Sequence, residues 1–387
     1  MRKIKIMHII TSLSTGGAER ACVNILKGGL SCRYENSVVS LCSGGYFEDV
    51  LRKSGIDVFS LYMKKGVPNP SLFFRLYRLL DFWKPDILQG WMYHGNIVAW
   101  MGSVLTQGKS PCLAWNIRHG LDWFEGEKPL TRDIIRLNGI LSNAPSHILY
   151  NSELSRSQHV AFGFRNDSSI VIPNGFDTHV FYPDSQDSLR VRNELNLPLD
   201  AFVIGHIARV HPIKDHQLFM RAAISVAHRH KQVFFMIVGH GVENMFEDYR
   251  NQIPEEISKR FLLLGERHDI PRLMRALNLF VQSSRSEAFP NVLGEAMACG
   301  VPCLATDVGD SSRIIGDTGW VVPPSHDKAM VESLEDLLSM DTRNLSSFSV
   351  AARQRVKSHF SLSSIVDQYT AVYEDMTNND LSISSCV

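Results

Sequence analysis

Short apolar runs alternate with amphipathic stretches along this chain, and this alternation restricts the fold more than any other feature. An apolar run bounded by turn residues favours a buried strand, whereas apolar residues spaced three and four apart favour a helix. In the first half, strands are predicted over 4–10, 36–42, 86–92 and 112–117, and helices over 18–30 and 70–83. Strands separated by helices form parallel sheets covered on both faces, so an α/β protein is predicted.

The composition changes between residues 170 and 184, where Pro, Asn, Gly and Asp are typical of turns. A second alternating series follows. Its strands are predicted over 201–210, 234–239, 261–265, 279–284 and 302–306, and its helices over 216–230, 270–277, 291–299 and 327–340. A chain of 387 residues exceeds one comfortable core. We therefore predict two open α/β domains, over 1–176 and 177–360.

The last helical stretch stands apart from both series. Residues 361–376 have helical spacing, and Ser361 is suited to be the N-cap. Residues 377–387 have the composition of a frayed end.

Charge is unevenly distributed, although 40 basic residues balance 40 acidic ones over the whole chain. Residues 1–175 carry 20 Lys/Arg and 13 Asp/Glu, and the remainder carries 20 and 27. The basic first half favours an anionic partner, either a phosphate-bearing substrate or an acidic membrane surface. A chance distribution of surface residues is an equally good explanation at this point.

Neither a metal site nor a membrane span is indicated. The seven cysteines form no CxxC pair and no His/Cys cluster, so no zinc site and no disulfide framework is expected. The first apolar run is too short for a signal peptide, and no 18 consecutive residues are apolar. A cytoplasmic location is expected.

Open α/β sheets bind ligands beyond the carboxyl ends of their strands, so function is expected in the strand-to-helix loops. Gly16 and Gly17 lie between the first strand and helix, where a phosphate or a sugar can approach backbone amides, or where they form only a turn. His94 and His119 end strand-like runs in the same half. His119 is the stronger candidate because polar and flexible residues surround it, although a lone histidine is more often structural.

In the second half, Arg209 and Lys214 follow a predicted strand and could hold a diphosphate, or could be solvated surface cations. Glu287 precedes a helix for which Asn291 is a suitable N-cap, and Glu295 lies about one turn inside it. The first amides of that helix, at 292–294, suit a phosphate. The two carboxylates could accept hydrogen bonds from sugar hydroxyls; the alternatives are dipole compensation for Glu295 and a solvated loop charge for Glu287.

These motifs together resemble the retaining glycosyltransferases of family 4, which have the GT-B fold. The resemblance rests on "SEAFPNVLGEAMACG", "GGAER", "PNGFD", "ARVHPIKDH" and "GDTGWVVPP", which span nearly the whole chain. It implies two Rossmann-like domains facing each other across a cleft. The first would bind the acceptor, the second would bind a nucleotide-sugar, and a C-terminal helix (361–387) would cross back to the first domain.

The resemblance also implies roles for individual residues. Glu287 would contact the donor sugar, and Glu295 the ribose. Arg209 and Lys214 would hold the diphosphate, and His119 would lie near the reacting carbon. Further donor contacts are expected from the glycine loop, from the loop before the helix and its first turn, and, near the base, from one arginine: Gly16, Gly17, Phe289, Asn291, Val292, Leu293 and Arg267. Many members have Gly after the Phe, whereas this chain has Pro290, which lacks an N–H, so a neighbouring amide must serve there.

The implied reaction is retaining, metal-independent transfer of a sugar to a hydroxyl of a glycan or lipid-diphosphate-linked acceptor in surface polysaccharide assembly, as in capsule or lipopolysaccharide. UDP is the favoured nucleotide. The chain has no Asp-x-Asp motif, and no cofactor, no metal and no nucleic acid are expected. Peripheral contact with the inner membrane surface is expected from the basic first half. The alternatives are a nucleotide-sugar 2-epimerase of similar architecture and a non-catalytic sugar-nucleotide-binding subunit.

Overall fold

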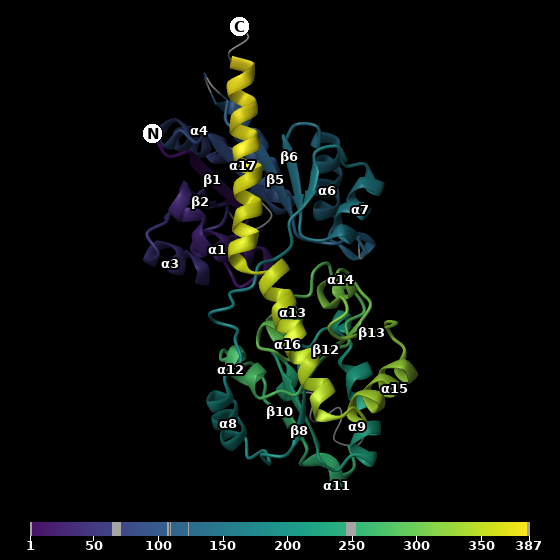
Figure 1. Cartoon of the computed structure of the whole chain (residues 1–387). Helices are drawn as coiled ribbons and strands as arrows, with labels where there is room; N and C mark the ends of the chain where they lie inside the picture. Colours follow the sequence, from purple (N-terminus) through teal and green to yellow (C-terminus); the bar gives the residue numbers. More distant parts are fainter. Residues whose placement is uncertain are drawn as a thin grey trace. The chain divides into compact units, whose positions relative to one another are not determined.

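The computed structural model describes residues 2–63, 71–106, 108, 110–122, 124–244 and 253–384, with side chains described as far as 378. Contacts within the chain divide it into two compact units, one formed by Met1–Gly175 with Leu362–Val387 and the other by Phe176–Ser361 (Figure 1). Both joints lie within one residue of the boundaries expected from the sequence.

The first unit is built on a parallel sheet in the order β3-β2-β1-β4-β5-β6-β7. Its strands are β1 (Lys5–Ile10), β2 (Glu35–Ser40), β3 (Asp57–Ser60), β4 (Ile87–Trp91), β5 (Cys112–Ile117), β6 (His147–Tyr150) and β7 (Ser169–Val171). The strand order reverses between β1 and β4. Ligands of open α/β sheets bind at such a reversal, beyond the carboxyl ends of the strands.

Helices cover both faces of this sheet. They are α1 (Gly17–Ile25), the π-helical turn η1 (Leu26–Leu30), α2 (Ser31–Arg33), α3 (Tyr46–Lys53), α4 (Ser71–Trp83), α5 (Met92–Leu105), η2 (Phe124–Gly126), α6 (Pro129–Leu141) and α7 (Glu153–Phe162). Buried side chains of α1 and α3 join one core, and those of α4, α5 and α6 join the core on the opposite face. The expectation of a doubly covered parallel sheet is confirmed.

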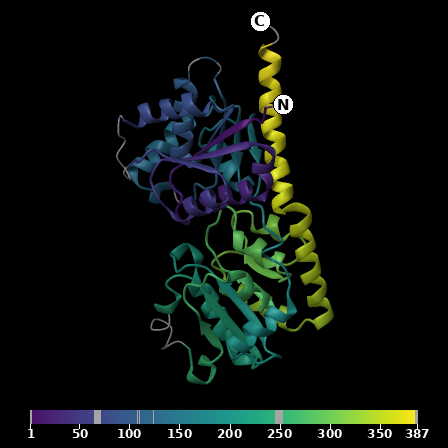
Figure 2. The ribbon, with the colours of Figure 1, turned by 90° about the vertical axis from the view of Figure 1, so that its left-hand side faces the viewer.

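The C-terminal helix α17 (Leu362–Ser384) belongs to the first unit, as expected, and lies alongside its purple and blue elements (Figure 2). Tyr369 and Tyr373 are fully buried in the core that contains α1. Asp367 accepts a hydrogen bond from Arg33 at 2.6 Å. The backbone is helical to Ser384, so the expectation of a frayed end is wrong for residues 377–384, and residues 385–387 lie outside the described part of the chain.

The second unit is built on a parallel sheet in the order β10-β9-β8-β11-β12-β13. Its strands are β8 (Phe202–Ile207), β9 (Val233–Val238), β10 (Phe261–Leu263), β11 (Leu279–Gln282), β12 (Cys303–Thr306) and β13 (Trp320–Val322). The strand order reverses between β8 and β11, which marks the expected ligand position in this unit.

Helices again cover both faces. They are α8 (Ser185–Glu194), η3 (Pro212–Lys214), α9 (His216–Arg229), η4 (Val242–Asn244), α11 (Glu255–Ser258), α12 (Ile270–Arg275), α13 (Asn291–Ala298), α14 (Ser311–Ile315), α15 (Asp327–Leu338) and α16 (Thr342–His359). Side chains of α8, α12, α13 and α16 join one core, and those of α9 and α15 join the other. Among the described helices, none combines the length and apolar composition that a bilayer-spanning segment needs.

Candidate active site

The loops that follow β8 and β11 meet where the strand order of the second unit reverses. Lys214 ends the short helical turn after β8, and Glu287 lies in the loop after β11, 73 residues further along the chain. Their side chains form an ion pair, with exposed fractions of 25% and 13%. The Ser284 hydroxyl donates to the same Glu287 oxygen at 2.8 Å. The structure thus brings together two of the residues singled out in the sequence.

The backbone at Lys214 is held by the residue that follows it. Asp215 has a left-handed conformation (φ 44°), and its buried carboxylate caps α9 by accepting from the Leu218 amide at 3.2 Å. Its other oxygen accepts from Arg285 at 2.7 Å. The Ser283 hydroxyl donates to the Lys214 carbonyl at 3.0 Å. These contacts tie the two loops together.

The Glu287 loop is also supported from the end of β12 and the loop that follows it. The Thr306 hydroxyl donates to the Ser284 carbonyl at 2.6 Å, and the Asp310 amide donates to the Ala288 carbonyl at 3.1 Å. Gly309 (φ 58°) packs so closely that a Cβ there would lie 2.3 Å from the Glu287 carbonyl oxygen. The position of Glu287 therefore depends on a glycine in the neighbouring loop.

Arg209 lies just beyond β8 and is exposed. The next residue donates its amide to the His240 carbonyl at 2.8 Å, which joins this loop to the one after β9. Within the described parts of the chain, no carboxylate pairs with Arg209. Its guanidinium is therefore available for an anionic ligand, in contrast to the paired ammonium of Lys214.

The helix after the Glu287 loop begins one residue earlier than expected. Asn291 is the first residue of α13 and the cap position belongs to Pro290, so the expectation that Asn291 is the N-cap is wrong. Pro fits this position because it needs no N–H. The Leu293 amide donates to the Pro290 carbonyl at 3.2 Å, so it is not free for a ligand as expected.

The remaining donor-site candidates of this region differ in burial. Asn291 and Val292 are partly exposed, whereas the side chains of Leu293 and Glu295 are buried. Phe289 is buried as well, with its ring 6.2 Å from that of Phe176, so it serves the core. Compensation of the helix dipole does not explain why Glu295 is buried, because an exposed carboxylate would interact with the dipole equally well.

Arg267 follows β10, three strands away from the Glu287 loop in the sheet order. Its guanidinium is paired with Asp269 through two hydrogen bonds of 2.7 Å. This pairing fixes the side chain at the carboxyl edge of the sheet.

Gly16, Gly17 and His119 belong to the first unit. Gly16 is the N-cap of α1 and Gly17 its first residue, so the glycine loop lies beyond β1, next to the reversal of strand order. A Cβ at Gly16 would lie 2.2 Å from Glu19 Oε2, and the Glu19 carboxylate accepts from Ser12 at 3.0 Å. The first turn of α1 therefore folds back onto this loop.

His119 lies in the loop after β5, as expected. The Ser155 hydroxyl of α7 donates to its carbonyl at 2.6 Å, and His119 Nε2 lies 3.6 Å from Glu127 Oε1. Burial lowers the pKa of His119 and outweighs the opposite effect of Glu127 and Asp122. The imidazole is therefore neutral at pH 7. His94 does not end a strand as expected, because it lies in the first turn of α5.

Sequence reasoning missed the polar side chains around Arg118. The guanidinium donates to Asn116 Oδ1 at 3.1 Å and to the Tyr369 hydroxyl of α17 at 2.9 Å, and it also bonds Asn174. It lies 5.6 Å from the centre of the Trp91 ring. The sequence signal for this cluster is that Asn116 lies near the end of β5 and Arg118 directly follows the strand. Among the described residues, no group of three or more His, Cys, Asp or Glu side chains could hold a metal ion.

Two family models match the chain. Residues 15–180 match the one described as Glycosyltransferase Family 4, and residues 201–340 match the one described as Glycosyl transferases group 1. The first range contains Gly16, Gly17 and His119, and the second contains the Lys214–Glu287 pair.

Two similar proteins are glycosyltransferases by name, and a similar solved structure contains UDP. The lipopolysaccharide core biosynthesis mannosyltransferase LpsB of Rhizobium meliloti (strain 1021) is 28% identical over 288 residues, which are 69% of this chain and 80% of that protein. The UDP-Gal:alpha-D-GlcNAc-diphosphoundecaprenol alpha-1,3-galactosyltransferase of Escherichia coli is 28% identical over 213 residues, 54% of each chain. The solved structure of Anabaena Alr3699/HepE in complex with UDP has the same fold, with a TM-score of 0.82 and 23% identity over 96% of this chain and 100% of that one.

Proposed function

This chain belongs to the glycosyltransferases of family 4 and has the α/β GT-B fold, and we propose that it moves a sugar from a UDP-sugar to a hydroxyl of a glycan or lipid-linked glycan, with retention at the anomeric carbon. One relative supports this choice through its name, which gives a UDP-sugar as the donor and a diphosphoundecaprenol-linked acceptor. The proteins described above do not favour a 2-epimerase or a non-catalytic subunit.

The observation that carries the proposal is the Lys214–Glu287 pair at the strand reversal of the second unit. A cation fixed at the carboxyl edge of the sheet is suited to the negative charge that grows on a departing diphosphate. Arg209, exposed in the same loop, adds a planar guanidinium that can bind phosphate oxygens in a bidentate way.

In the proposed reaction, the bond between the anomeric carbon and the donor phosphate breaks, and the acceptor oxygen bonds to the same face of that carbon. The acceptor proton passes to the leaving diphosphate, which departs as UDP. Lys214 and Arg209 stabilise the diphosphate and take the place of a metal ion. Glu287 holds Lys214 in position and accepts hydrogen bonds from the donor sugar.

Further donor contacts are assigned to α13 and to the base side of the sheet. The first amides of α13, at Asn291 and Val292, lie at the positive end of the helix dipole and would meet phosphate oxygens. Glu295 would bind the ribose and Arg267 would lie beside the base.

The first unit would supply the acceptor side. We assign Gly16 and Gly17 to the approach of donor phosphate and acceptor, and His119 to the neighbourhood of the reacting carbon. Its neutral imidazole can donate or accept a hydrogen bond without adding charge. We also propose that the protein acts in the cytoplasm at the inner membrane surface, in capsule or lipopolysaccharide assembly. The surplus of seven basic residues in 1–175 supports this location, because it would be attracted to anionic lipids.

A thermal-shift screen of UDP-, GDP- and ADP-sugars tests the donor, because a ligand that binds only the folded state raises the Tm. UDP-sugars are expected to give the largest rise, with a smaller rise in Lys214→Ala. Transfer of the stabilising sugar to a lipid-linked acceptor, followed by NMR of the new anomeric proton, then tests retention, and EDTA tests independence from metals. A product of inverted configuration, or full loss of transfer in EDTA, would contradict the corresponding part of the proposal.

A further inference from the structure

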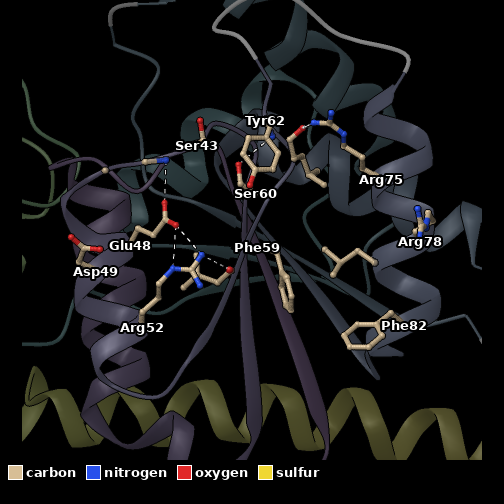
Figure 3. Close-up of a pocket in the computed structure, with 15 residues that line it drawn as sticks. Ser43, Glu48, Asp49, Arg52, Phe59, Ser60, Tyr62, Arg75, Arg78 and Phe82 are labelled. Atoms are coloured by element: carbon tan, nitrogen blue, oxygen red, sulfur yellow. Dashed lines mark hydrogen bonds and ion pairs between the residues drawn. The ribbon is translucent and has the colours of Figure 1, made fainter.

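A large hollow lies in the first unit, outside the residues assigned above (Figure 3). Its volume is about 1030 Å³, and it opens between α3 and α4, beside the carboxyl end of β3. Ligand pockets are typically about 300–1,000 Å³, so a sugar carrying further groups would fit. All the described residues that line it belong to the first unit.

The α4 wall of the hollow carries two arginines one turn apart. Arg75 donates to the Leu61 carbonyl at 3.0 Å and stacks 5.4 Å from the centre of the Tyr62 ring. Arg78 lies 5.7 Å from the centre of the Phe74 ring. No carboxylate of the described residues pairs with either guanidinium. Two exposed and unpaired guanidinium groups on one wall favour an anionic ligand.

The α3 wall has the opposite character. Glu48 accepts from Arg52 at 2.9 Å and from the Gly44 amide at 3.1 Å, so its carboxylate is held in place. Asp49 is exposed beside it and points away from that pair in Figure 3. The Glu48 carboxylate, fixed at the rim of the hollow, can accept hydrogen bonds from the hydroxyl groups of a sugar.

Tyr62 stands between the two walls. The residue is 65% exposed, and its backbone has a left-handed conformation (φ 54°), which is unfavourable for a residue with a large side chain. Arg75 fixes one side of the ring. An exposed aromatic ring held by a cation is a surface on which a sugar ring can stack, and it retains that position at a cost in backbone strain.

The hollow is joined to the glycine loop of the first unit. A Cβ at Gly45 would lie 2.4 Å from the Leu13 carbonyl oxygen, and the Phe47 amide donates to the same oxygen at 2.9 Å. Leu13 lies in the loop that leads from β1 to Gly16 and Gly17. The lining of the hollow and the glycine loop therefore pack directly on each other.

We propose that this hollow binds a glycosyl phosphate or diphosphate, with the anionic group on Arg75 and Arg78 and the sugar between Tyr62 and Glu48. Naming this ligand the acceptor rests on the proposed function. The same chemistry occurs in a lipid-linked diphosphate and in a soluble sugar phosphate. Leu79 and Phe82 continue the α4 wall beyond Arg78, and Phe82 is 77% exposed, which would suit the first carbons of a lipid.

The test uses the whole chain with saturating UDP, which occupies the proposed donor site. Inorganic pyrophosphate, N-acetylglucosamine 1-phosphate and a decyl-diphosphate-linked N-acetylglucosamine are titrated by calorimetry. The double variant Arg75→Gln/Arg78→Gln is compared with wild type. Arg190→Gln serves as a control because it removes an exposed arginine of α8 that pairs with no carboxylate among the described residues. Each lost charge-assisted hydrogen bond is expected to weaken binding by about tenfold or more.

We expect each of the three probes to have the same affinity for wild type and for the control. Each should bind the double variant at least about tenfold more weakly. Arg78→Lys should bind pyrophosphate more tightly than Arg78→Gln but more weakly than wild type, because lysine keeps the positive charge and lacks the planar guanidinium. Equal affinity in the double variant and wild type, or no binding of any probe to wild type, would overturn the proposal. Because Arg75 also bonds Leu61, Arg78→Gln alone is measured as the variant that disturbs no backbone contact.

The source of the ligand and the proposed function are separated by the remaining arms. Much tighter binding of the decyl probe than of the 1-phosphate indicates a lipid-linked ligand, and equal binding indicates a soluble one. UDP affinity, measured in the same variants, should not change. Failure of UDP and UDP-sugars to bind wild type would count against the proposed function, whereas normal UDP binding without binding of the phosphate probes would count against the hollow alone.

Discussion

Replacing Gly309 by alanine should displace the candidate catalytic carboxylate without touching it. The new Cβ would lie 2.3 Å from the Glu287 carbonyl oxygen and 2.6 Å from that of Ala288. Real Cβ atoms essentially never come closer than 3.0 Å, so the two loops must separate by about 0.7 Å. A misplacement of about 1 Å can lower catalysis about 10²-fold, so we expect turnover to fall by about 10- to 100-fold.

The control for this variant is Gly55→Ala. Gly55 also has a positive φ (76°), but a Cβ there meets nothing within 4 Å. Backbone strain alone should cost each variant about 1–2 kcal/mol of unfolding free energy, and overpacking should cost Gly309→Ala about 1–3 kcal/mol more. Urea unfolding measures the unfolding free energy of each variant, and UDP release measures its turnover. The reasoning fails if Gly309→Ala loses no more activity and stability than Gly55→Ala.

Three further outcomes are expected. Lys214→Ala should lower turnover, measured as UDP release, by about 10²–10³-fold, the effect of removing one charge-stabilising group, whereas Arg190→Gln should leave it unchanged. Near-normal turnover in Lys214→Ala would contradict a role of Lys214 in stabilising the leaving diphosphate. Burial lowers the pKa of His206 from 6.5 to about 3. Below pH 6.5 the unfolded chain therefore takes up a proton that the folded chain does not, so stability decreases as the pH falls, and the Tm of His206→Gln should drop less between pH 7 and pH 5 than that of wild type. Tyr369→Phe removes a hydroxyl that bonds two side chains of the first unit at 2.7 and 2.9 Å, so urea unfolding should show a loss of about 1–3 kcal/mol, while the exposed Tyr46→Phe shows none.

Much of the fold could be predicted because strand and helix periodicities are local. The strands β1, β4, β5, β8, β10, β11 and β12 lie within the runs named from the sequence, and β2 and β9 each begin one residue before theirs. The helix α5 was missed because it is buried on several sides, with Gly95, Ala99 and Gly102 among its buried residues, so it shows no polar face. Reading His94 as a strand end follows from the same absence of periodicity.

The candidate site was only partly predictable. Lys214 and Glu287 were named separately, as a diphosphate ligand and a sugar ligand, and nothing local in the sequence indicates that they pair. The capping of α13 differed by one residue because Asn and Pro are both favourable near a helix start, and only the backbone geometry distinguishes them.

The sequence by itself determined two alternating α/β series, their loops and the residue types that those loops carry. These properties depend on neighbours within a few positions along the chain. The order of the strands in each sheet was decided only by tertiary structure, because pairing joins segments that are far apart in sequence. The reversal between β8 and β11 brings Lys214 to Glu287 across 73 residues. The packing of Gly45 on Leu13 likewise joins the hollow to the glycine loop.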